Sequence, residues 1–222
     1  MKLLPIRARA TEGSPQACEL FFIDRTKFSS EYFSKSVLPL LPGIDKEEYE
    51  SQIETPAIRM HTDIATQVTK YTADIEKFAH LYRSAKINLH IDFKVPNYLW
   101  IEDRVCFTLP IKNEPEIYAK DLFRVYSIPE GELFVIFSFY LRENILGYIK
   151  ECIVNKEVPD KPDFQQEQPL VHTSEIDKLN QSLLSYESFG RVVVLKEIVE
   201  RKRKKKQYTA NMPSPHSPIF GK

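Results

Sequence analysis

Six consecutive cations near the C-terminus are the residues of this sequence most able to bind a ligand. They are Arg201, Lys202, Arg203, Lys204, Lys205 and Lys206. A block of this kind neutralises phosphates and releases their counterions, so its binding weakens steeply as salt rises. Because the block has no means of reading base edges, such binding would tolerate any nucleic-acid sequence. A nuclear import signal has the same composition, and is the alternative interpretation.

The charge of the chain is divided between its body and this tail. Lys and Arg together number 31, as do Asp and Glu, so the formal net charge is zero. Positions 201–222 contain 7 of the cations and no acid, which leaves 24 cations against 31 acids in positions 1–200. The tail is therefore expected to contact an anionic partner, either nucleic acid or an acidic protein surface, or to fold back on its own body.

A magnesium-dependent nuclease is the enzymatic alternative. Asp92 and Lys94 lie on one face of an expected strand and match the D-x-K half of a pattern in which carboxylates and a lysine hold Mg²⁺. The ion needs oxygen ligands from two or more carboxylates near the scissile phosphate. A pattern this short also arises by chance, so a solvated strand face is the simpler interpretation. The further candidate residues are His90, Glu76, Glu102 and Asp103.

Motifs for other chemistry are absent from the sequence. The closest pair of its 6 glycines, Gly131 and Gly147, is 16 positions apart, so there is no glycine-rich phosphate loop or nucleophile elbow. The histidines lack metal-ligand spacing, and Cys18, Cys106 and Cys152 form no C-x-x-C pair. We expect no cofactor and no structural metal. The odd number of cysteines favours a reducing, intracellular setting, cytoplasmic or, in a eukaryote, nuclear.

A long amphipathic helix is expected over residues 55–85. Thr55 is a good N-cap, and Pro56 follows at the first helical position. Apolar residues then recur at alternating steps of four and three, the a/d pattern of heptads. This stripe either packs on the domain's own sheet and helices or forms a dimerising or partner-binding coiled coil. Its members are Ile64, Val68, Tyr71, Ile75, Phe78 and Tyr82.

Alternation of apolar and polar residues predicts most of the strands. Residues 2–9 and 19–24 are expected to form one hairpin, and the segments at 87–93 and 101–109 to be the next two strands. A further hairpin is expected from residues 123–128 and 132–140, joined by Pro129, Glu130 and Gly131. Residues 133–137, apolar on both faces, would be its central strand. Short helices are predicted at 29–37, 45–53 and 141–154.

These elements predict one α+β domain with an appendage. Residues 1–154 would form an antiparallel meander sheet packed by the long amphipathic helix and the shorter helices. Residues 155–172, with three prolines, are expected to be a linker or surface loop. Residues 173–200 would contain a helix and a strand at 192–199, and residues 201–222 would be a disordered basic tail.

The sequence thus favours a non-enzymatic binding or assembly protein that contacts nucleic acid nonspecifically through its tail. One alternative is a structural subunit, in a homodimer or larger complex, whose tail docks an acidic partner. The other is the nuclease based on Asp92 and Lys94. The longest largely apolar run, residues 133–141, is well short of the roughly 20 residues of a membrane helix, so we expect no membrane contact.

Overall fold

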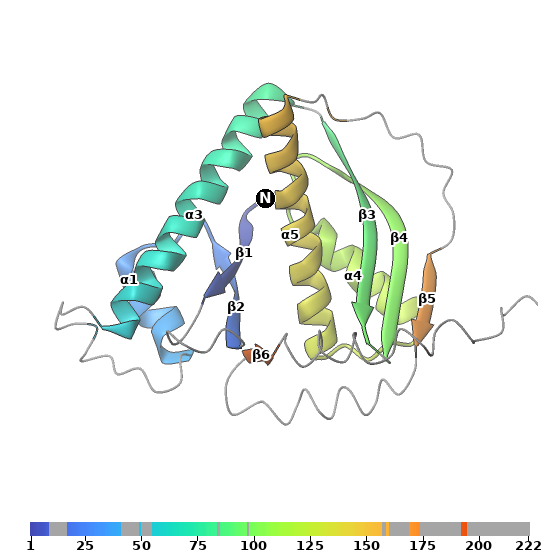
Figure 1. Cartoon of the computed structure of the whole chain (residues 1–222), viewed down its shortest axis with the longest axis horizontal. Helices are drawn as coiled ribbons and strands as arrows, with labels where there is room; N and C mark the ends of the chain where they lie inside the picture. The colour runs from blue at the N-terminus through green and yellow to red at the C-terminus, as the bar shows by residue number, and fades with distance from the viewer. Residues whose placement is uncertain are drawn as a thin grey trace, which may run out of the picture.

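The computed structural model describes residues 1–8, 17–40, 49, 55–83, 85–96, 98–156, 159, 169–173 and 192–194. Two long helices diverge from a common end, with one sheet between them and a second sheet beside them (Figure 1). The antiparallel sheets packed with helices confirm the predicted α+β class. The basic tail, the helix expected after residue 173 and, apart from Tyr49, the helix expected at 45–53 lie outside the described residues.

The first sheet begins with the predicted N-terminal hairpin. Strand β1 (Leu3–Ala8) pairs antiparallel with β2 (Ala17–Asp24). The short strand β6 (Val192–Val194) pairs with the start of β2, which gives the order β1-β2-β6. The third strand of this sheet therefore comes from a segment far along the chain, and β6 lies within the strand predicted at 192–199.

A short helical segment follows β2, as the sequence predicted for residues 29–37. Helix α1 (Ser30–Tyr32) is capped by Ser29, whose Oγ accepts a hydrogen bond from the Tyr32 amide at 3.1 Å. The chain continues through a π-helical turn η1 (Phe33–Val37) and a 3₁₀ turn η2 (Leu38–Leu40). The segment is anchored because Phe33, Val37 and Leu38 are all buried.

Helix α3 (Pro56–Leu81) is the predicted long helix. Its N-terminus is capped as expected, because Thr55 Oγ1 accepts from the Ile58 amide at 3.4 Å and Pro56 occupies the first turn. The helix packs against β1 and against the last long helix of the chain. It therefore covers one side of the first sheet and closes the core there.

The second sheet contains the two predicted alternating strands. β3 (Lys86–Val95) and β4 (Leu99–Thr108) form an antiparallel hairpin, and β5 (Leu170–Thr173) adds to β4. Strand β5 lies in the segment expected to be a linker or loop. Val171 packs against the core, and Tyr126 Oη donates to the carbonyl of Pro169 at 2.8 Å. Contacts with distant residues therefore hold this strand.

The hairpin predicted over residues 123–128 and 132–140 is wrong. Helix α4 (Glu114–Val125) ends where its first strand was expected, and α5 (Glu132–Asn155) replaces the second. Helix α5 is surrounded by both sheets and by α3 and α4, so many of its side chains are buried. A helix buried on most sides and a central strand give the same continuous apolar run, and periodicity cannot separate them. The predicted helix at 141–154 is the second half of α5.

A fully buried arginine ties the elements around α5 together. Arg142 Nε and Nη2 bind the Glu116 carboxylate of α4 at 2.5 and 2.7 Å. Its Nη1 donates to the Leu3 carbonyl of β1 at 2.9 Å, and Nη2 also donates to the Lys112 carbonyl at 2.8 Å. The guanidinium is thus satisfied by a carboxylate and two main-chain carbonyls, as a buried charge requires.

The free edge of β1 is closed by side chains rather than by another strand. The Arg25 amide donates to the Lys2 carbonyl, so Lys2 is a hydrogen-bonded position of the β1–β2 pair, and hydrogen-bonded positions alternate along a strand. The main-chain groups of Leu3, Pro5 and Arg7 therefore point away from β2. Leu3 is bound by Arg142, and Pro5 has no amide hydrogen to satisfy. Gln67 of α3 accepts from the Arg7 amide at 3.4 Å and donates to its carbonyl at 2.7 Å. No further strand can therefore add at this edge.

Replacing the buried arginine tests its role. Arg142→Met should lower the free energy of unfolding by about 3–5 kcal/mol, because it leaves the partly buried Glu116 carboxylate and two carbonyls without their donor. Arg124→Met is the control, since Arg124 forms an exposed pair with Asp121 at 3.0 Å and should change stability by less than about 1 kcal/mol. Urea unfolding of both variants measures the difference, and equal losses would contradict the assignment.

Gly147 is a position where a substitution should increase stability rather than lower it. It lies within α5 on an exposed position, and a Cβ added there meets nothing within 4 Å. Gly147→Ala should therefore stabilise the protein by about 0.5–1 kcal/mol, because glycine loses more backbone freedom than alanine in a helix. The reverse change at an exposed position of α3, Ala79→Gly, should cost a similar amount. Thermal unfolding compares the two, and destabilisation by Gly147→Ala would refute the expectation.

His61 of α3 should make stability depend on pH. Its ring lies 4.8 Å from that of Phe33, 5.8 Å from that of Phe28 and 5.7 Å from that of Tyr49, and burial among them lowers the pKa of His61. The unfolded chain, with a histidine pKa of about 6.5, is therefore protonated first as pH falls. Stability due to this group is constant above that pH and declines below it.

The measurement is the melting temperature of the wild type and His61→Gln between about pH 7.5 and pH 5.5. Wild type should lose stability on acidification through this window, and His61→Gln should lose less. His80→Gln, at an exposed position of the same helix, is the matched control and should follow the wild type. If His61→Gln and wild type decline in parallel, His61 is not the responsible group.

Candidate nucleic-acid interface

The six cations at 201–206, the first candidate site, lie outside the described residues. The nearest described residue before them is Val194, at the end of β6, seven positions before Arg201. Seven residues span at most about 25 Å when fully extended. Strand β6 and the turn between β3 and β4 lie at the same end of the molecule (Figure 1). The sequence separation therefore limits Arg201 to within about 25 Å of Val194.

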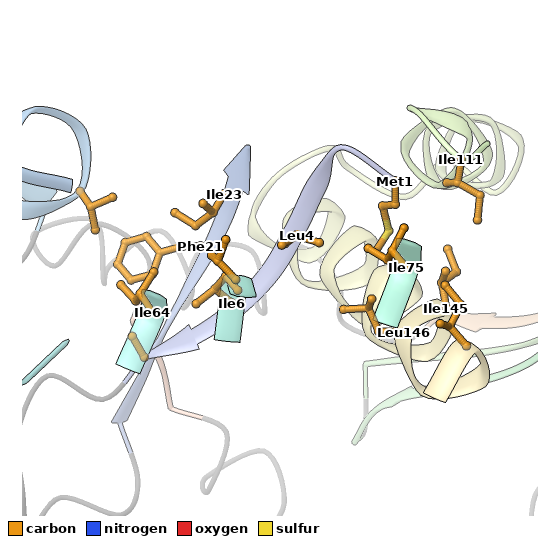
Figure 2. Close-up of a cluster of buried hydrophobic side chains, with 14 of the residues drawn as sticks. Met1, Leu4, Ile6, Phe21, Ile23, Ile64, Ile75, Ile111, Ile145 and Leu146 are labelled. Atoms are coloured by element: carbon orange, nitrogen blue, oxygen red, sulfur yellow. The ribbon is translucent and has the colours of Figure 1, made fainter. Parts of the chain in front are cut away.

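The heptad-like apolar stripe of α3 packs in the protein's own hydrophobic core. Its members Ile64, Val68, Ile75 and Phe78 are at most 6% exposed, and Tyr71 and Tyr82 pack against the same core. Figure 2 shows Ile64 beside Phe21, Ile23 and Ile6, and Ile75 beside Met1, Ile145 and Leu146. A partner could reach this stripe only by displacing the protein's own core. In the described residues the stripe therefore packs inside the chain, which is the first of the two interpretations, and the partner-binding coiled coil stays a prediction.

The second sheet has one buried face and one exposed face. Phe93, Ile101 and Val171 point toward α4 and α5 and belong to or pack against one core cluster. The residues between them in sequence point outward, because side chains alternate along a strand. The pairing register aligns Lys94, Trp100 and His172 in one row across the outer face of β3, β4 and β5. We call these three residues the Trp100 row.

Trp100, the only tryptophan of the chain, is the centre of this row. The His172 ring is stacked on the indole, with centroids 5.4 Å apart and planes inclined by 22°. Lys94 Nζ lies 4.5 Å from the centre of the indole, a cation–π contact. The row is therefore an ordered set of one cation and two flat rings on a solvent-facing sheet.

Asp92 holds the row in place. Its Oδ1 accepts from Trp100 Nε1 at 2.9 Å and pairs with Lys94 Nζ at 2.6 Å. The hydrogen bond from Lys94 lowers the pKa of Asp92, with a further contribution from Trp100, although partial burial acts in the other direction. Asp92 is therefore an anion at neutral pH, and its charge is already neutralised by Lys94.

Only some of the nuclease residues lie together. On the outer face Asp92 is directly opposite Glu102, with His90 and Lys94 two positions away along β3 on either side. Glu102 Oε1 lies 3.6 Å from His90 Nε2, whereas Asp103 points to the other face of the sheet and accepts from Tyr118 Oη at 2.5 Å. Glu76 binds Arg25 at 2.9 Å on the other side of the fold. In the part of the chain that the structure describes, no group of three or more His, Cys, Asp or Glu side chains could hold a metal. Asp92 and Lys94 form an ion pair instead.

The outer face carries more cations than anions. Lys86, Lys94 and Arg104 are exposed there, against the carboxylates of Asp92 and Glu102. Each of these carboxylates faces a basic group of the same face, Asp92 the lysine of the row and Glu102 an imidazole. With Asp92 paired to Lys94, the cations Lys86 and Arg104 stand against the one carboxylate of Glu102, so the face keeps an excess of one cation.

No known protein-family model matches the chain, and no curated protein matches its sequence. Among the described residues, no helix is long and apolar enough to cross a membrane.

Sequence reasoning missed Trp100 and His172. The alternating pattern places the start of the strand at residue 101, whereas β4 begins at Leu99, two positions earlier, and the prolines near His172 indicate a loop there. The signal for Trp100 is nevertheless present, because the alternation that buries Ile101 turns the preceding side chain outward. Nothing local indicates the position of His172, which depends on the pairing of β5 with β4.

Proposed function

We propose that this chain is a non-enzymatic binding protein that contacts nucleic acid, without sequence preference, through the six cations at 201–206. The observation that carries the proposal is the charge division, seven cations and no acid after residue 200 and an excess of acids before it. Polyanions with a high density of phosphates bind such a block through counterion release. Contacts made by the folded body would then determine where on an assembly or nucleic-acid strand the tail binds.

The acidic body favours a second candidate. Positions 1–200 carry seven more acids than cations, so the tail of one copy can contact the body of another copy or of an acidic partner. In this role the protein is a structural subunit of a larger assembly. Light scattering separates the two candidates, because a monomer at all concentrations and low salt would count against a self-assembling subunit.

The test is fluorescence anisotropy of labelled duplex DNA, single-stranded DNA and RNA over a salt series. A full-length variant with all six residues 201–206 changed to Gln should bind much more weakly. The slope of log K against log salt should become shallower by about 0.7–0.9 for each phosphate that the tail no longer neutralises. An equal slope in the variant and the wild type would refute the role of the tail.

A matched control removes the same number of charges elsewhere. Changing six exposed lysines of the body to Gln should leave the salt slope nearly unchanged if the tail binds the phosphates. Weaker binding by this control, with the tail variant unaffected, would assign the phosphate contacts to the body. The six are Lys27, Lys35, Lys70, Lys77, Lys120 and Lys150.

A further inference from the structure

We infer that the outer face of β3, β4 and β5 binds unpaired nucleic-acid strands by stacking bases on the Trp100 row. The inference deepens the proposed function and rests on nucleic acid being the ligand class, but it concerns a different part of the chain. The tail contacts phosphates of any strand, whereas the row discriminates between single strands and duplex. A duplex keeps its bases stacked on one another and cannot offer their faces to a sheet.

One face of the Trp100 indole is covered by the ammonium group of Lys94. Lys94 lies over the ring with its side chain 39% exposed, and its stem belongs to an edge strand. Stacking of a base on an aromatic ring is stronger than an exposed cation–π contact. A base can therefore take the place of the ammonium over the ring, while Lys94 keeps its ion pair with Asp92 and so keeps that carboxylate from repelling the strand.

His172 continues the flat surface outward. Its ring is exposed and nearly parallel to the indole, and β5 carries it at the far side of the sheet from Lys94. The ring face turned away from Trp100 is a second position for a base. Because every base has a flat face, such stacking tolerates any sequence, in agreement with a tail that reads none.

The charge of the face suits a phosphate backbone. Arg104, four residues along β4 from Trp100, and Lys86, eight residues along β3 from Lys94, are exposed cations of the same face, and the carboxylate of Asp92 is paired with Lys94. The turn between β3 and β4, next to the paired residues Lys94 and Trp100, lies at the end of the molecule where β6 is found (Figure 1), and the six cations begin seven residues after β6. One strand can therefore contact the row and the tail together.

The experiment uses the full chain with a labelled thymidine oligomer of about 12 nucleotides and a duplex of the same length. Because Trp100 is the only tryptophan, its fluorescence reports on this site alone. The single strand should quench it and the duplex should not. In anisotropy, Trp100→Ala and His172→Ala should each weaken single-strand binding roughly tenfold and leave duplex binding unchanged.

Two matched variants guard against indirect effects. Trp100→Phe keeps an aromatic ring without the indole N–H and should retain most of the single-strand affinity. Lys94→Gln should weaken single-strand binding, whereas Lys120→Gln, at an exposed position of α4, should not. Thermal unfolding of each variant checks that the fold is intact. Should Trp100→Ala fail to fold, Trp100→Phe and His172→Ala carry the test.

The outcomes separate the two proposals. If Trp100→Ala and His172→Ala leave the ratio of single-strand to duplex affinity unchanged, stacking on the row is refuted even though the tail binds. If the six-Gln tail variant binds as the wild type does while the row variants weaken, the tail proposal fails and the row stands. An absence of both quenching and anisotropy change with the full chain overturns both.

Discussion

The buried Arg142 guanidinium is the interaction on which the rest of the structure depends. Removing an arginine from water costs several kcal/mol, and only a carboxylate and well-placed carbonyls offset that cost. Glu116 and the carbonyls of Leu3 and Lys112 supply them, from α4, β1 and the loop between β4 and α4. Since these partners lie in fixed directions around the guanidinium, α5 has one rotation and one height at which the charge is satisfied.

That rotation also positions the candidate interface. Tyr140 is two residues before Arg142, and its Oη accepts from the Asp92 amide at the free edge of β3, at 3.1 Å. The Asp92 side chain in turn holds both Lys94 and Trp100. The next residue after Arg142, Glu143, binds Arg7 of β1 with two hydrogen bonds. Helix α5 therefore binds both sheets and fixes the first sheet relative to the outer-face side chains of the second.

The elements that the sequence predicted correctly have one solvent-exposed face and one buried face. Helix α3 and both β-hairpins show a clear period of 3.6 or 2, and each was located within a few residues. Helix α5 has no solvent-exposed face over much of its length, so the residue pattern of its first half resembles that of a buried strand. The arginine within that run looked like the end of an apolar segment, although it is the most buried cation of the described residues. Strand β5 depends wholly on distant partners.

Stability does not explain why a tryptophan stands at position 100. Its contacts are an exposed cation–π pair, the stacked ring of His172 and a surface hydrogen bond, and the ion pair beside it is solvent-exposed, so together they contribute about 2–3 kcal/mol. Loss of the Arg142 network costs more than that, and this network already fixes the sheet through Tyr140. A threonine or valine would satisfy the strand equally well. The large ring on the outer face is therefore better accounted for by a ligand that stacks on it than by the fold.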